Sequence, residues 1–148
     1  VESLALFGTA ADGEIVDRTA LDSLFAPRDD PAALRASLAN AFGADLGAYP
    51  DVIADIVDWR AEEDADRAGF EAQAAAMTGY RAEQLYEVAV PARVFHGVSD
   101  AIAPTSAGED LAADLPRGEF LAVEGGHLCF VEESAAVNDA LVGFFDEE

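Results

Sequence analysis

Three short apolar runs constrain the fold of this chain more than any other feature. They span residues 3–7, 88–96 and 119–123, and a glycine follows each run within two positions. The first run is typical of a strand that is buried in a parallel sheet, whereas residues 88–96 alternate and indicate a strand whose entry is set by Pro91. Helical patterns follow the last two runs, at 107–115 and at 132–145, and the order strand, helix, strand, helix predicts parallel neighbours. We therefore expect an α/β fold with a short parallel sheet of about three strands.

The segment between the first two runs is helical in pattern. It extends from residue 18 to about 85, and the predicted helices begin at Pro31, at Pro50 and at Ala61. Proline is favoured in the first turn of a helix, and apolar residues recur at the helical spacing along the segment. The 148 residues thus form a single domain, in which residues 18–85 are a helical insertion and residues 88–148 return to strands and helices.

The chain is strongly acidic. Thirty acidic residues stand against eight basic ones, all of them arginine, and the formal net charge is −22. Nucleic acid, itself a polyanion, would be repelled. The acidic residues are spread among apolar positions, and a hydrophobic content of 51% is ample for a core, so we interpret them as the surface of a globular protein. Because lysine is absent, we hypothesise that the protein is adapted to a very salty cytosol. Salt there screens the repulsion between the acidic residues, which would otherwise destabilise the compact state.

Cysteine content and hydropathy indicate the cellular compartment of the protein. Cys129 is the only cysteine, which excludes an internal disulfide. No apolar run approaches the roughly 18 residues that a membrane span needs, and no signal-peptide pattern is present. We expect a soluble, cytoplasmic protein that does not bind membranes. The chain begins with Val1 rather than methionine, which leaves a processed, an alternative and a truncated start open.

Two side chains suited to acid–base chemistry follow the last two predicted strands. Asp100 follows the second apolar run, and His127 follows the third. The carboxyl ends of parallel strands meet at one edge of a sheet, where open α/β sheets carry their chemistry. An aspartate there can fix the tautomer of a histidine that acts as a base. An aspartate after a strand is more often a simple turn residue, whereas Gly125 and Gly126 before the histidine permit a tight loop beside a ligand.

Residues 88–145 resemble the closing stretch of a cap-bearing α/β-hydrolase, a group that includes small esterases and enol-lactonases. The resemblance implies that Asp100 is the catalytic acid, that His127 is the base and that residues 18–85 are the helical cap. It also implies a small ester or lactone-like substrate and chemistry without a metal or cofactor. On this alignment the chain holds the second half of a hydrolase domain. The motifs that carry the resemblance are Val94-Phe95-His96-Gly97 with Asp100, and Gly125-Gly126-His127 before the last helix.

The nucleophile of such a hydrolase is missing from the sequence. No Gly-x-Ser-x-Gly motif precedes Asp100. Residues 97–101 spell Gly-x-Ser-x-Ala, which makes Ser99 a candidate, but a nucleophile elbow needs a helix directly after the serine and Ile102-Ala103-Pro104 indicates a turn. We therefore expect this chain to supply the acid and the histidine but not the nucleophile, and to be inactive alone.

Three other interpretations of the same residues stay open. One is a non-catalytic remnant or interaction module, in which the acid and the histidine persist without a serine. Another is a thiol enzyme, in which His127 activates Cys129 two residues away. A metal site would combine these two residues with His96 and Asp100, but their spacings match no familiar ligand motif. Taken alone, His96 is typical of a packed structural histidine.

The predicted strand at residues 3–7 bears on the partners of the chain. In a three-stranded sheet in chain order this strand lies at an edge, where apolar side chains and unpaired backbone groups are exposed. We expect the chain alone to associate through this edge with a copy of itself or with a complementary N-terminal half, or to be poorly soluble.

Overall fold

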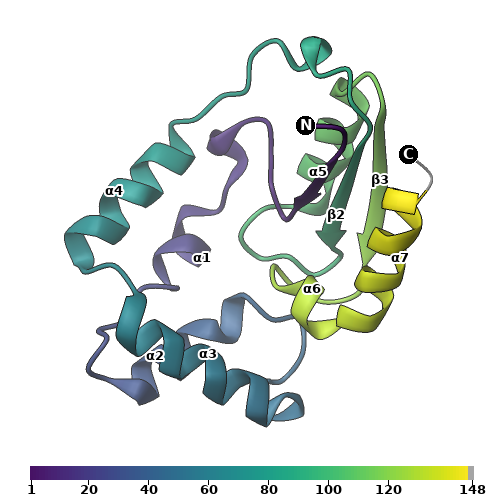
Figure 1. The fold of residues 1–148 in the computed structure, drawn as a ribbon. Helices are drawn as coiled ribbons and strands as arrows, with labels where there is room; N and C mark the ends of the chain where they lie inside the picture. Colours follow the sequence, from purple (N-terminus) through teal and green to yellow (C-terminus); the bar gives the residue numbers. More distant parts are fainter. Residues whose placement is uncertain (147–148) are drawn as a thin grey trace.

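The computed structural model describes residues 1–146 and contains a three-stranded parallel sheet (Figure 1). The strands are β1 (Leu4–Phe7), β2 (Ala92–Gly97) and β3 (Gly118–Val123), in the order β1-β2-β3. Both neighbours of β2 run parallel to it, so the carboxyl ends of all three strands reach the same edge of the sheet. The predicted α/β fold with a short parallel sheet is confirmed.

Helices cover both faces of the sheet. In β2, the adjacent residues Val94 and Phe95 are both fully buried, and they point to opposite faces as successive side chains of a strand do. Val94 packs with α5 (Thr105–Asp114), and Phe95 packs with α7 (Ser134–Asp146). Residues 88–96 were expected to alternate, and burial of β2 on both faces explains why Val94 and Phe95 are both apolar.

The insertion between β1 and β2 is helical and has a core of its own. α2 (Pro31–Ser37) lies against α3 (Pro50–Glu63), and both Leu34 and Ile53 are completely buried there. The insertion also contains α1 (Arg18–Asp22) and α4 (Arg67–Thr78), and the short α6 (Cys129–Glu132) follows β3. The 3-10 turns of the described chain are Gly13–Ile15, Leu38–Asn40, Leu46–Ala48 and Leu85–Glu87. Figure 1 shows α1 to α4 grouped beside the sheet, on the side away from α7.

One predicted helix start in the insertion is wrong. The pattern predicted a helix from Ala61, but Ala61 belongs to the last turn of α3, and the next helix begins at Arg67. The reason is the cap: the Asp66 side chain accepts a hydrogen bond from the backbone N–H of Gly69 at 2.8 Å, which starts α4 at that point.

Two other boundaries also differ from expectation. β2 starts at Ala92 rather than at residue 88, because Leu85–Glu87 form a 3-10 turn and Pro91 has no N–H to give to a strand ladder. The last helix is divided into α6 and α7, because Glu133 between them has a ψ of 39°, outside the helical range. No helix within residues 1–146 is long and apolar enough to cross a membrane.

β1 lies at one edge of the described sheet. Within residues 1–146 no strand pairs with its outer side, and its four side chains are half-buried. Phe7 stacks on Phe95 with ring centroids 4.7 Å apart and meets Phe130 edge-on at 5.5 Å. The exposed edge that the sequence predicted is therefore present in the described chain, with its apolar side chains partly covered from within.

Candidate active site

Two loops at the carboxyl ends of β2 and β3 carry the predicted site residues. Asp100 lies on the loop after β2, and His127 lies on the loop after β3. The backbone N–H of Ser99 donates to the carbonyl oxygen of Gly125 at 2.9 Å, which joins one loop to the other. The fold thus brings together two residues that are 27 positions apart in the sequence.

Glycines allow the close approach of these segments. A side chain at Gly97 would collide with the carbonyl oxygen of Gly126. Gly8, at the end of β1, has a positive φ of 51° that favours glycine, and a Cβ atom there would lie 3.1 Å from Nδ1 of His127. The imidazole of His127 is therefore packed directly against the backbone at the end of β1.

Asp100 and His127 form a hydrogen-bonded pair. Nδ1 of His127 lies 2.8 Å from Oδ2 of Asp100, whose side chain is completely buried. The second carboxylate oxygen accepts the backbone N–H groups of Ile102 at 2.8 Å and Ala103 at 3.0 Å. Burial opposes ionisation of Asp100, but hydrogen bonds from His127 and His96 outweigh it and hold the pKa of the carboxyl well below its usual range.

His96 is a second imidazole in contact with Asp100. It is fully buried in β2, as expected of a packed structural histidine. Its Nε2 lies 3.0 Å from the carbonyl oxygen of Ala103 and 3.3 Å from Oδ2 of Asp100, so this N–H is shared between two acceptors. Burial disfavours the charged form of His96, but the hydrogen bonds with Asp100 and Ala103 raise its pKa above the ordinary value. Asp100 is thus surrounded by four N–H donors.

His127 presents its other ring nitrogen to open space. Its side chain is 28% exposed, and its ring lines two cavities, one of about 270 Å³ and one of about 340 Å³. The hydrogen bond to Asp100 keeps the proton on Nδ1, so Nε2 carries the free lone pair. This imidazole is arranged to accept a proton from a group that enters either cavity.

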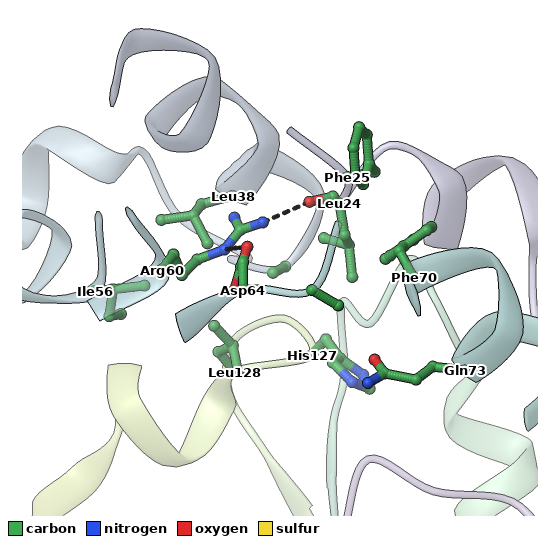
Figure 2. A pocket seen from close by; sticks show the side chains of 12 residues that line it. Leu24, Phe25, Leu38, Ile56, Arg60, Asp64, Phe70, Gln73, His127 and Leu128 are labelled. Atoms are coloured by element: carbon green, nitrogen blue, oxygen red, sulfur yellow. Dashed lines mark hydrogen bonds and ion pairs between the residues drawn. The ribbon is translucent and has the colours of Figure 1, made fainter. Parts of the chain in front are cut away.

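The smaller cavity lies between the helical insertion and the loop that carries His127 (Figure 2). Gln73 of α4 lines the same cavity as His127, and Figure 2 shows its side chain extending toward the His127 ring. The cavity is otherwise mainly apolar, with walls that include Leu24, Phe25, Leu38, Ile56, Phe70 and Leu128.

Arg60 is the cationic residue in this cavity wall, and its guanidinium is already engaged. Nε donates to Asp64 at 2.7 Å, one terminal nitrogen donates to the carbonyl oxygen of Leu24 at 2.7 Å, and the other donates to the Ser37 hydroxyl at 2.7 Å. Figure 2 shows the bonds to Asp64 and Leu24. The cation therefore holds the insertion together and has little left to offer a bound anion.

The two alternative nucleophiles, Cys129 and Ser99, both lie in positions that do not suit that role. Cys129 is fully buried, and burial together with the negative charges of Asp100 and Glu132 raises its pKa to about 11. A thiol with so high a pKa holds its proton at neutral pH, which argues against the thiol-enzyme interpretation. Ser99 sits in an exposed turn, and the next helix starts only at Thr105, which is the turn predicted in place of a nucleophile elbow.

The candidate metal ligands do not assemble into a metal site. Among residues 1–146, no group of three or more histidine, cysteine, aspartate or glutamate side chains is placed to hold a metal ion. The combination of His96, Asp100, His127 and Cys129 considered above is therefore not such a group.

Sequence reasoning missed two polar residues near His127. Gln73 of the insertion lines the cavity that His127 lines, and Glu132 accepts the backbone N–H of Gly126, the residue before His127, at 2.7 Å. Gln73 lies on an exposed helix face and Glu132 on a charged stretch, so neither stands out in the sequence. The one available signal is that Glu132 ends the short helix α6, which begins just after His127.

Sequence comparison finds a likeness in only part of the chain. No family model matches. A stretch of 59 residues, 39% of the chain, is 37% identical to "Putative non-heme bromoperoxidase BpoC" of Mycobacterium tuberculosis. That stretch covers 22% of the bromoperoxidase, so the match spans about a fifth of the length of the curated relatives.

Solved structures match almost the whole chain. The enol-lactonase from Burkholderia xenovorans LB400 is similar with a TM-score of 0.78 and 25% identity, over 99% of this chain and 56% of that one. An esterase from Exiguobacterium antarcticum is similar with a TM-score of 0.74 and 20% identity, over 97% of this chain and 57% of that one. The chain thus spans a little more than half the length of either protein.

Proposed function

We propose that this chain, which has the α/β-hydrolase fold over the part of that fold it spans, supplies the acid and base of a serine hydrolase acting on esters or lactones. The observation that carries the proposal is the 2.8 Å contact between Asp100 and His127 at the carboxyl ends of two parallel strands, with the imidazole open to an apolar cavity. The similarity to an enol-lactonase and an esterase supports the substrate class.

The nucleophile and the oxyanion-hole donors would come from residues outside this sequence. Among residues 1–146 no serine hydrogen-bonds to His127, and the chain covers only 56% of the enol-lactonase and 57% of the esterase. We propose that the missing segment precedes Val1, either in a longer chain or in a separate one. It would pair with the open edge of β1, whose end at Gly8 already touches the His127 ring.

The proposed chemistry is acyl transfer through a covalent serine ester. His127 takes the serine hydroxyl proton at Nε2 while the serine oxygen bonds to the carbonyl carbon of the substrate. Asp100 keeps the other ring proton on Nδ1 and stabilises the imidazolium. His127 then gives its proton to the departing alkoxide as the carbon–oxygen bond breaks. Water repeats these steps, releasing the carboxylic acid and the free serine, and no metal or cofactor is needed.

The cavity wall favours an uncharged, apolar acyl group. Its lining is mostly aliphatic and aromatic, and a cavity of about 270 Å³ suits a short acyl chain rather than a large ring system. Arg60 is neutralised by Asp64 and by neighbouring carbonyl and hydroxyl oxygens, so a carboxylate on the acyl chain would gain no partner there. We therefore propose small neutral esters or lactones as substrates.

The surface of the chain bears on its setting. A net charge of −22 without any lysine supports a salt-rich cytoplasm, because screening by salt relieves repulsion between the acidic residues. The same charge supports the absence of nucleic acid among its partners. Self-association through the β1 edge would also require such screening, since two copies of the chain repel each other.

The test compares the 148-residue chain alone with the same chain completed by the proposed segment, as the residues encoded in frame before Val1 or, where there are none, as a co-expressed N-terminal half; both are called the extended protein. We expect the extended protein to hydrolyse p-nitrophenyl butyrate and His127→Gln to lower its kcat by at least about 100-fold, the usual contribution of a general base. The matched control is Glu109→Gln, an exposed change on α5. An unchanged kcat in the His127 variant would refute the proposal. An extended protein without hydrolysis would favour the non-catalytic module.

A further inference from the structure

We propose that Glu132 is a positioning residue that clamps the His127 loop to the helical insertion. This inference rests on the proposed role of His127 as the base. Oε2 of Glu132 accepts the backbone N–H of Gly126 at 2.7 Å. Oε1 accepts the N–H groups of Gly43 at 3.0 Å and Ala44 at 3.1 Å, which lie in the insertion 89 and 88 residues before it. One carboxylate thus bridges the two segments.

The two segments touch backbone to backbone at this bridge. A Cβ atom at Gly43 would lie 2.7 Å from the backbone nitrogen of Gly126, and one at Gly126 would lie 2.6 Å from the backbone nitrogen of Gly43. Neither position can take a side chain without displacing the other segment. The N–H of Leu128 also donates to the carbonyl oxygen of Ala41 at 2.8 Å. We call this contact between residues 41–44 and 125–128 the seam.

Glu132 is the acceptor on which the seam depends. Its carboxylate has no cationic partner among residues 1–146, so its charge is compensated by these backbone N–H groups alone. Gly126 is buried, and no other described acceptor takes its N–H. Without the carboxylate this N–H would be left unsatisfied, whereas Gly43 and Ala44 are exposed and can turn to water. The loss should therefore act mainly on the loop that carries His127.

The seam connects the cavity to the base. Ala41 and Leu128, which are joined across it, both line the cavity that His127 lines. A shift of the insertion would therefore move the cavity wall and the imidazole together. Without the clamp, we expect the loop to sample positions in which Nδ1 of His127 no longer reaches Asp100.

The experiment is NMR on the full 148-residue chain, comparing Glu132→Gln with the matched control Glu133→Gln, an exposed neighbour. The wild-type carboxylate has two acceptor oxygens for three N–H donors, and Oε2 lies within reach of both Gly126 and Gly43, at 2.7 and 3.2 Å. The glutamine keeps one acceptor oxygen, and its NH₂ group repels the N–H donors that face it, so the two segments are no longer held as in the wild type. We expect amide exchange at Gly126 to rise by about 10–100-fold and the Nδ1–H signal of His127 to broaden or vanish, with Phe95 in β2 unchanged. The control should match the wild type at every site.

Each outcome decides the proposal. Unchanged exchange at Gly126 together with an unchanged His127 signal overturns it. Faster exchange at Gly43 alone also overturns it, because Glu132 would then hold only the insertion. If Glu132→Gln fails to fold, amide exchange of the wild-type chain tests the proposal instead. Protection factors of Gly43 and Gly126 that agree within about threefold support a joint opening of the two segments. A protected Gly126 with a freely exchanging Gly43 refutes the clamp. None of these readings needs hydrolysis, so this inference and the proposed function can fail separately.

Discussion

Replacement of Asp100 by asparagine tests the buried acid most sharply. The carboxylate accepts four N–H groups, two from backbone at one oxygen and two from imidazoles at the other. The asparagine oxygen should stay with the backbone donors, which cannot turn away, and its NH₂ group must then face the imidazoles. His127 can respond by moving its proton to Nε2, which leaves Nδ1 as an acceptor and removes the lone pair needed for base catalysis.

The cost of this change follows from the bonds that are lost. Two hydrogen bonds to a charged acceptor contribute about 1.5–3 kcal/mol each. One neutral bond to His127 returns about 1 kcal/mol, and the desolvation of a buried charge is no longer paid. We therefore expect Asp100→Asn to lower the free energy of unfolding by about 2–4 kcal/mol at pH 7.

The assay is urea unfolding of the wild type and the variant at constant high KCl, from pH 7 to pH 3. The pKa of Asp100 is lowered in the folded state, so its stabilisation is complete above the unfolded-state value of about 3.9 and is lost as the pH falls toward the folded value. The gap between the two proteins should thus shrink by about 1 kcal/mol between pH 5 and pH 3. A gap that stays constant, or a variant as stable as the wild type, would refute this account of Asp100.

Two further predictions concern the seam and the surface. Gly126→Ala should lower the free energy of unfolding by about 1–3 kcal/mol, because its Cβ meets the backbone of Gly43. Gly143→Ala on α7 has open space around it and should raise the free energy of unfolding by about 0.5–1 kcal/mol. Chemical unfolding of both variants checks this, and equal effects would contradict it. Raising KCl from 0.1 M to 2 M should raise the melting temperature by more than about 5 °C, because salt screens the −22 net charge. Calorimetry measures this temperature, and a lower value in 2 M KCl would contradict the salt hypothesis.

The sheet and the acid–base pair were predictable because their signals are local. Each strand is a short, mostly apolar stretch, and the carboxyl ends of parallel strands must share an edge, so the placement of Asp100 and His127 follows once the strands are found. The turn at Ser99 was predictable from Ile102-Ala103-Pro104 for the same reason. Such features need only neighbouring residues and the handed geometry of the chain.

The other parts of the site depend on contacts that leave no mark in the sequence. Glu132 binds backbone N–H groups, which every residue except proline offers, so its partners Gly43 and Ala44 could not be identified. The start of α4 was misplaced because the apolar pattern continues across Asp66, whose cap decides the boundary. The contact of His96 with Asp100 needed the shape of the turn between them.

The most direct test of the central claim is to find which residue a fluorophosphonate probe modifies. The protein extended by the residues encoded before Val1 is labelled, digested and analysed by mass spectrometry. The account predicts one modified serine, located before Val1, and loss of labelling in the His127→Gln variant. A label on Ser99, or labelling at the same rate without His127, would contradict the claim that this chain supplies the base for a nucleophile outside it.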